Sequence, residues 1–144
     1  MRGALLLGLV VLAGCQAVAP LPPQASLRVL SVAPAELGAT AHGREEPGLA
    51  EACRDWRLTP AQVERFFALS RRYHAGEGLQ RDFYFLPCRI TGQLEAEGRR
   101  WDYIINAAAT ASWRHAGEVR EFGCADSACA PLVLLMPDDG AGAD

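Results

Sequence analysis

The sequence predicts an α+β fold, in which one amphipathic helix packs across a small antiparallel β-meander of four to five strands that carries two disulfides. Three observations support this prediction. An apolar stripe with helical spacing follows Thr59, the pattern changes to the two-residue period of strands after Asp82, and four cysteines lie in or beside these segments. A length of 144 residues leaves room for one domain, which we place at residues 50–136.

Residues 1–14 are typical of a bacterial lipoprotein signal peptide. One positive charge at Arg2 precedes an apolar run over residues 4–13. This run is too short to cross a bilayer, since a spanning helix needs about 20 apolar residues. The ending Leu-Ala-Gly-Cys at residues 12–15 resembles the lipobox of bacterial lipoproteins. That resemblance implies diacylglycerol on the sulfur of Cys15 and a third fatty acyl chain, such as palmitate, on its amine, which together anchor a protein stably to a bilayer.

The residue that follows Cys15 indicates which of the two bacterial membranes holds the protein. In such lipoproteins an aspartate at this position tends to retain the protein at the inner membrane, and this chain has Gln16. The resemblance therefore implies the periplasmic face of the outer membrane. The alternative is an ordinary secretory signal, with a cysteine that falls by chance near an apolar N-terminus.

The two ends of the mature chain are expected to lack a core. Residues 15–49 form a Pro-, Ala- and Gly-rich tether with no aromatic side chain through Pro47. Within the tether, residues 27–32 alternate in part and include two β-branched side chains, so they are a candidate edge strand. Residues 137–144 have no large apolar side chain to anchor them, which predicts a disordered tail.

The clearest element is a helix that begins after Thr59. Thr59 is a favourable N-cap, Pro60 suits the first helical position because it has no N–H, and Gln62 completes a capping box. Gly76 and Gly78 are expected to end the helix. Its apolar stripe could bind a partner, but burial against the protein's own sheet is the commoner use of such a face. The members of the stripe are Val63, Phe66, Phe67, Ser70 and Tyr73.

Five extended segments are expected after the helix. Large apolar residues alternate with others over residues 101–106, which is the pattern of a strand with one buried face. Pro87 donates no ladder hydrogen bond, so it marks an edge or a bulge. The five segments cover residues 83–94, 101–106, 110–114, 118–122 and 132–136, with turns at 95–98 and 115–117.

The four cysteines after the anchor fit two disulfides, because an exported domain lies where disulfides persist. Three pairings are possible. We favour Cys53–Cys88, which would fasten the beginning of the helix to the sheet, and Cys124–Cys129, which closes a short local loop. Closing the longer span would stabilise the fold by about 3–4 kcal/mol in the chain-entropy account.

The cysteines and histidines do not have the spacing of a metal or redox site. Zinc sites usually show Cys-x2-Cys or His-x3-His pairs, whereas His42, His74 and His115 are scattered and the close cysteines are separated by four residues. Thiol exchange normally uses Cys-x-x-Cys. Ser127 has no histidine and acid partner that the sequence can place. We therefore expect no metal, no cofactor and no enzymatic activity, and a hydrolase would need a pocket that joins such groups.

Charge argues against a nucleic-acid partner. The chain carries a formal net charge of −3, and loss of Arg2 with the signal leaves 13 basic and 17 acidic side chains, a net −4. A polyanion is repelled by such a balance, and a basic protein is electrostatically easier to bind.

Three short patterns mark the second half of the chain: Pro-Cys-x-Ile-x-Gly at 87–92, Trp-x-Tyr-x-Ile-Asn-Ala at 101–107 and Phe-Gly-Cys-x4-Cys at 122–129. With them the chain resembles a group of small secreted or lipidated proteins of Gram-negative bacteria. The resemblance implies the same compact, disulfide-bonded fold and no particular activity. Ala108 and Ala109 stand where the pattern would favour glycine, which questions a tight turn there.

A second resemblance concerns the loop between Cys124 and Cys129. Periplasmic inhibitors of vertebrate-type lysozyme present a rigid loop bounded by Cys-x4-Cys, which makes Asp126 and Ser127 a candidate binding loop. Those inhibitors carry basic and imidazole side chains in the loop, and this chain has neither.

The function expected from the sequence is that of a non-catalytic envelope lipoprotein, anchored to a bilayer through Cys15, whose domain binds an envelope protein. The alternative is an inhibitor or immunity-type lipoprotein that blocks a cell-wall-degrading enzyme through the Cys124–Cys129 loop.

Overall fold

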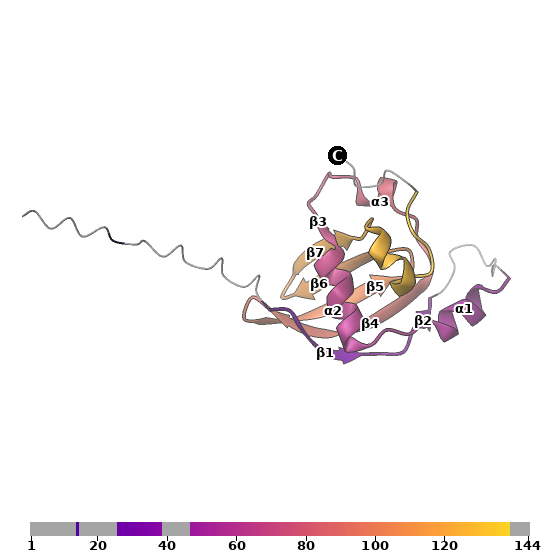
Figure 1. Cartoon of the computed structure of the whole chain (residues 1–144), viewed down its shortest axis with the longest axis horizontal. Helices are drawn as coiled ribbons and strands as arrows, with labels where there is room; N and C mark the ends of the chain where they lie inside the picture. The colour runs from indigo at the N-terminus through magenta and orange to yellow at the C-terminus, as the bar shows by residue number, and fades with distance from the viewer. Residues whose placement is uncertain (1–13, 15–25, 39–46, 139–144) are drawn as a thin grey trace, which may run out of the picture.

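The computed structural model describes residues 14, 26–38 and 47–138. Residues 1–13 of the predicted signal peptide, the predicted lipidation residue Cys15 and residues 139–144 of the predicted tail lie outside the described residues. The described chain folds around an antiparallel sheet of seven strands (Figure 1). The strands are β1 (Arg28–Val32), β2 (Glu36–Leu37), β3 (Arg71–Tyr73), β4 (Cys88–Ala96), β5 (Arg99–Asn106), β6 (Thr110–His115) and β7 (Glu118–Gly123). The helices are α1 (Leu49–Asp55), α2 (Pro60–Leu69), α3 (Leu79–Asp82) and the 3-10 helix η1 (Ser127–Leu132).

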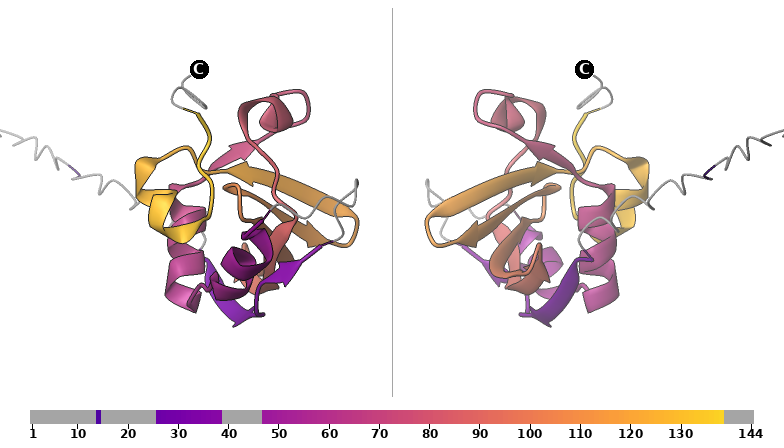
Figure 2. Two further views of the ribbon diagram at one scale, coloured as in Figure 1. Left: turned by 90° about the vertical axis from the view of Figure 1, so that its right-hand side faces the viewer. Right: turned by 90° about the vertical axis from the view of Figure 1, so that its left-hand side faces the viewer.

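The sheet order is β1-β4-β5-β6-β7-β3, and β2 pairs with β4 beyond the end of β1. Helices α2 and η1 cover one face of the sheet, which we call the inner face (Figure 2). The α+β class is confirmed. The predicted number of four to five strands is wrong, because the sheet has seven.

The additional strands are short. Within the candidate edge strand at residues 27–32, Arg28–Val32 form β1, whereas β2 has two residues and β3 has three. Segments of two or three residues are too short to show a period in the sequence, and they exist because β4 and β7 offer unpaired backbone groups beside them. The sequence predicts a single helix, which is α2, and the structure also contains the short helices α1, α3 and η1.

Helix α2 begins as the sequence predicts and ends earlier. The hydroxyl of Thr59 accepts from the backbone N–H of Gln62, and the Gln62 side chain accepts from the N–H of Thr59, so the capping box is complete. The helix ends at Leu69, where Ser70 becomes extended. The prediction that Tyr73 belongs to the helical stripe is wrong, because the chain gains ladder hydrogen bonds with β7 when residues 71–73 become a strand.

Two segments predicted as extended are not strands. Residues 83–87 form an irregular loop after α3, and β4 begins only at Cys88. Leu132 ends η1, which contains Pro131, and residues 133–136 follow it. This segment is held by the N–H groups of Leu134 and Leu135, which both donate to the carbonyl of Ala107. Each segment buries an apolar side chain, Phe83 or Leu132, without joining the sheet, so its sequence resembles that of a strand.

The two hairpins of the meander form as expected. Turns at Glu97-Gly98 and Ala116-Gly117 connect β4 to β5 and β6 to β7. Between β5 and β6 the chain turns tightly although glycine is absent, because Ala109 adopts a left-handed backbone with φ 70°.

The core lies between α2 and the inner face of the sheet. Phe67 of α2 contacts three aromatic rings from three strands in edge-on geometry, with centroids 5.9 Å from Tyr103, 5.4 Å from Trp113 and 5.5 Å from Phe122. Trp101, Tyr103 and Ile105 are buried as their alternation predicts. Burial of these large side chains is the main stabilising contribution.

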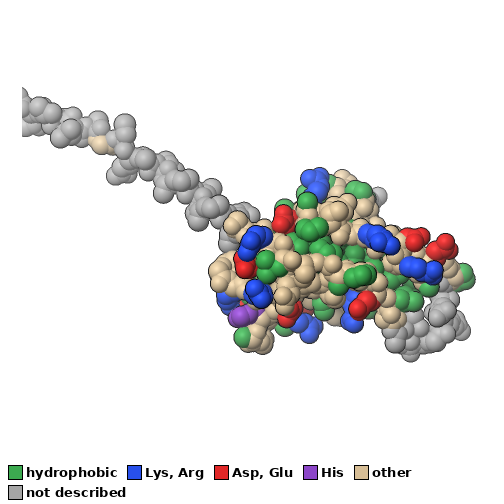
Figure 3. All heavy atoms as spheres, turned by 90° about the horizontal axis from the view of Figure 1, so that it is seen from below, with side chains coloured by type: hydrophobic (Ala, Val, Ile, Leu, Met, Phe, Trp, Pro, Cys, Tyr) green, Lys and Arg blue, Asp and Glu red, His purple; other side chains and the backbone are tan. Residues whose placement is uncertain are grey.

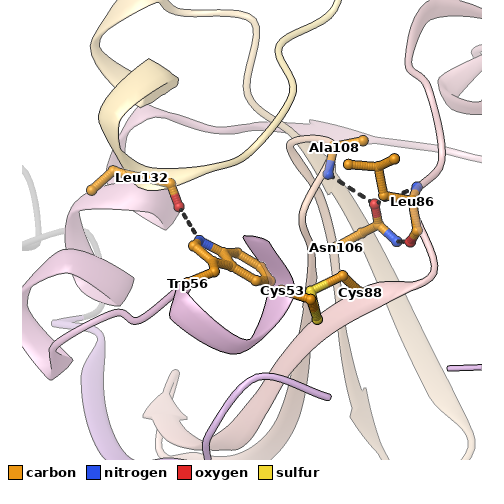
Figure 4. The surroundings of a disulfide bond; sticks show 7 residues. All are labelled: Cys53, Trp56, Leu86, Cys88, Asn106, Ala108 and Leu132. Carbon is orange, nitrogen blue, oxygen red and sulfur yellow. Dashed lines mark hydrogen bonds between the residues drawn. A yellow bond between two sulfur atoms is a disulfide. The ribbon is translucent and has the colours of Figure 1, made fainter. Parts of the chain in front are cut away.

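Both disulfides join the pairs favoured from the sequence, Cys53–Cys88 and Cys124–Cys129. Figure 4 shows the first of them between α1 and the beginning of β4. Nearby, the indole N–H of Trp56 donates to the carbonyl of Leu132, 2.9 Å away, and so ties η1 to the segment after α1. Among the described residues, no helix has the length and apolar character needed to span a membrane.

Tyr103 links β5 to the edge strand, and its removal has a predictable effect. Its hydroxyl donates to the carbonyl of Ser31 over 2.7 Å, and burial raises the pKa of Tyr103 to about 12. The fold therefore favours the neutral phenol, so stability is complete below pH 10 and falls as the pH rises from 10 to 12. We expect Tyr103→Phe to lower the free energy of unfolding by about 1 kcal/mol at pH 7.

The same substitution should also flatten the loss of stability between pH 10 and pH 12, and urea unfolding at several pH values measures both effects. Tyr84→Phe is the control for the effect at pH 7, because it removes the hydrogen bond of an exposed hydroxyl to Asp138. An alkaline loss that persists unchanged in Tyr103→Phe would contradict the assignment.

Candidate functional site

The candidate site lies on the face of the sheet that points away from α2, which we call the outer face. The strand register fixes which side chains share this face, because paired residues point to the same side. On β5 and β6, Ile104 lies opposite Ser112 and Asp102 lies opposite Arg114. On β7, Glu121 lies opposite Ser112. The outer face is thus mostly polar, in contrast to the aromatic inner face.

A groove of about 450 Å³ is hollowed into the outer face, and we call it the outer-face groove. Its floor includes Ile104 and Ser112 in the middle of the sheet. One wall is apolar and comes from the loop that precedes β4. The wall residues are Phe85, Leu86 and Pro87, and the charged residues of the groove are Arg89, Arg114 and Glu121.

The side chain of Asn106 holds the apolar wall in place. Its amide nitrogen donates to the carbonyl of Leu86 over 2.6 Å, and its oxygen accepts from the N–H groups of Leu86 and Ala108, at 3.2 Å and 2.9 Å (Figure 4). Asn106 is only 9% exposed. One buried amide therefore fixes both the wall and the turn that follows β5, so the wall is preorganised.

We expect Asn106→Ala to lower the free energy of unfolding by about 2–3 kcal/mol, because three backbone groups lose their partner. Urea unfolding measures this loss, and hydrogen exchange at the Leu86 amide reports whether the wall opens. Gln93→Ala is the control, because it removes an exposed side-chain bond to Asp102 on the same face. If the two substitutions cost the same, Asn106 does not hold the wall.

The ring of Phe85 is the most conspicuous feature of the wall. It is 77% exposed although it lies on a fixed loop. Beside it, Tyr84 is half-exposed, and its hydroxyl donates to the carboxylate of Asp138 over 2.6 Å. This bond to Asp138 raises the pKa of Tyr84. Large aromatic side chains on a preorganised surface are typical of binding sites.

The charges in the groove are largely uncompensated. Arg89 lies 3.6 Å from the carboxylate of Glu36, and both side chains are exposed. Among the described residues, neither Arg114 nor Glu121 lies within 4 Å of an oppositely charged group. Both can therefore pair with groups on a ligand.

A second group of charges, around Trp101, is paired. Around Trp101, the guanidinium groups of Arg99 and Arg120 lie 4.7 Å and 4.5 Å from the indole ring, and both contact Glu97 and Glu118. These contacts lower the pKa of Glu118, with the hydrogen bond from Arg120 as the main cause. On the face that Figure 3 shows, acidic and basic side chains are interspersed with hydrophobic ones. The ion pairs between Glu97, Arg99, Glu118 and Arg120 connect the two hairpins near their turns, so this cluster has a structural role.

The candidate loop between the paired cysteines lies elsewhere. Asp126 and Ser127 are exposed at the beginning of η1, which packs on α2 and not on the outer face. The carboxylate of Asp126 accepts from the N–H of Ala128 over 2.8 Å, so it caps η1. The structure therefore gives Asp126 and the Cys124–Cys129 disulfide a structural role.

Ser127 and His115 are not brought together. In the β6–β7 pairing, His115 lies opposite Glu118 at one end, whereas Gly123, which leads to the η1 loop, lies opposite Thr110 at the other. These ends are separated by about 17 Å along the strands. The ring nitrogen Nδ1 of His115 lies 2.9 Å from the carbonyl of Arg100. Within residues 26–38 and 47–138, no three His, Cys, Asp or Glu side chains gather as metal ligands do.

Sequence reasoning did not single out the groove residues. Two signals pointed to them: adjacent aromatic residues at positions 84 and 85, and polar residues at alternate positions 110, 112 and 114 of a predicted strand. No protein-family model, curated protein or solved structure matches this chain. The geometry of its own side chains therefore guides the functional assignment.

Proposed function

We propose that this chain is a non-catalytic lipoprotein of the bacterial cell envelope, held by acyl chains on Cys15 at the periplasmic face of the outer membrane, whose domain binds another envelope protein. The observation that carries this proposal is the exposed ring of Phe85, on a loop that Asn106 holds through the backbone of Leu86, beside a groove with unpaired charges. Exposed aromatic side chains and arginines on a rigid surface are the usual anchors of protein interfaces.

The arrangement along β4 supports this proposal. Arg28, at the beginning of the described domain, lies opposite Glu95, whereas Arg89 of the groove lies near the other end of β4. These positions are about 20 Å apart along the strand. If the tether enters the domain at Arg28, the groove lies at the opposite end of β4, where a partner can reach it.

The disulfides support the expected compartment. Cys53–Cys88 and Cys124–Cys129 account for every cysteine after Cys15, and paired cysteines persist in oxidising compartments outside the cytosol.

Site-specific photocrosslinking in a Gram-negative host tests the binding function. A photoreactive phenylalanine analogue at position 85 should give a discrete crosslinked protein in the envelope fraction. The same analogue at Arg65, which is exposed on α2 on the opposite side of the sheet, should not. Equal labelling from both positions, or none from position 85, would refute the proposal.

The anchor and the rival function have separate tests. Cys15→Ser should release the protein from membranes, and continued membrane association would refute the lipid anchor. Inhibition of a lysozyme by the intact protein that is relieved by Asp126→Ala would instead support the inhibitor hypothesis.

A further inference from the structure

We propose that the outer-face groove takes an extended peptide segment in which an acidic side chain lies beside a large apolar one. This inference rests on the proposed protein-binding function and names the chemistry of the partner segment. It is carried by the shape of the groove, its apolar wall and its unpaired arginine.

The shape favours an extended chain. A second hollow of about 380 Å³, bordered by Leu79 and Phe83, adjoins the outer-face groove. The two hollows share Phe85, Thr110 and Glu121, so they lie side by side on the outer face. Two adjacent open hollows fit successive side chains of an extended peptide better than a compact ligand, which would need an enclosing pocket.

The apolar wall selects a large apolar side chain. Phe85 and Ile104 provide hydrophobic contacts on one wall and on the floor. Because Asn106 already fixes the backbone of Leu86, a peptide that packs against this wall does not have to order it.

The charges select a carboxylate. Arg114 projects from the outer face of β6 and has no carboxylate within 4 Å among the described residues. Asp102, its cross-strand neighbour, instead accepts a hydrogen bond from Gln93 over 3.1 Å. An acidic side chain of the peptide can therefore form a charge-assisted pair with Arg114, with Arg89 nearby on β4.

The same charges disfavour a polyanion. Glu121 also lines the groove, and Glu36 pairs with Arg89 at its edge, so several phosphates in a row would meet carboxylates. A peptide segment with a single carboxylate satisfies the arginine and leaves Glu121 for a backbone N–H or a basic side chain.

Selection from a random peptide library tests the inference without knowledge of the natural partner. The full-length protein, purified from membranes, is used to select twelve-residue peptides displayed on phage, with counter-selection against Phe85→Ala. We expect the enriched sequences to share an acidic residue next to an aromatic or large aliphatic one. A synthetic peptide with this consensus should then bind the protein in a fluorescence anisotropy assay.

Two arginine variants decide the role of charge. Arg114→Gln should weaken binding of the consensus peptide roughly tenfold. Arg100→Gln should leave it unchanged within about twofold, because Arg100 is exposed on neighbouring β5 but does not line the groove. Thermal unfolding is used to check that both variants are folded.

Several outcomes would overturn the inference. These are a consensus without an acidic residue, binding that survives Arg114→Gln, and failure to enrich any peptide. Binding of isolated glycan or muropeptide fragments in place of peptides would also overturn it. Each of these outcomes leaves the crosslinking test at position 85 unaffected, so failure of this inference and failure of the binding function are distinguishable.

Discussion

Replacing Cys53 and Cys88 together by alanine is expected to lower the free energy of unfolding by about 3–4 kcal/mol, because the disulfide closes a span of 35 residues in the unfolded chain. The bond is also the main attachment of α1. Cys53 is the only buried residue of that helix, and the other residues of α1 are exposed or half-buried. Loss of the bond should therefore free α1 before it affects the sheet.

Urea unfolding measures the global effect, and hydrogen exchange at the amides of α1 measures the local one. Cys124→Ala with Cys129→Ala is the matched control, because it removes a disulfide that closes a span of only 5 residues. The chain-entropy account gives about 2 kcal/mol for that shorter loop. If removal of the short disulfide costs as much as removal of the long one, the entropy of the unfolded chain does not determine the difference.

The parts of the fold that were predictable are those fixed by local sequence. The capping box at Thr59 and Gln62 marks the beginning of α2, and the alternation over residues 101–105 identifies the buried face of β5. The end of α2 could not be predicted in this way. Arg71 to Tyr73 continue the helical pattern, but pairing with β7, about fifty residues later, makes them a strand.

Part of the candidate site also follows from local rules. The two-residue turn at Ala116-Gly117 sets the register of β6 and β7, and this register places Ser112 opposite Glu121 on the outer face. The wall of the groove does not follow from the sequence. Residues 83–87 look like a strand, and long-range contacts, among them the hydrogen bonds of Asn106 to Leu86 and of Gly38 to Pro87, hold them as a loop that presents Phe85.

Gly92→Ala is expected to destabilise the protein by about 3 kcal/mol, near the upper end for insertion of a methyl group into a packed site. Gly92 lies where three strands meet. Its partner on β5 is Tyr103, whose ring passes over it to reach the carbonyl of Ser31 on β1. A Cβ at position 92 would lie 2.1 Å from the Ser31 carbonyl oxygen and 2.4 Å from the Tyr103 hydroxyl.

Neither group can move alone. The Ser31 carbonyl is part of the backbone of β1, so relieving the clash with it would separate β1 from β4. Relieving the clash with the Tyr103 hydroxyl would break the hydrogen bond between Tyr103 and Ser31. Gly38→Ala is the control, because the nearest atom to its Cβ would be 3.6 Å away and its backbone is not left-handed. We expect urea unfolding to show a large loss for Gly92→Ala and almost none for Gly38→Ala, and hydrogen exchange to show β1 opening first. Equal stability of the two variants would mean that β1 is not packed against β4 as closely as described.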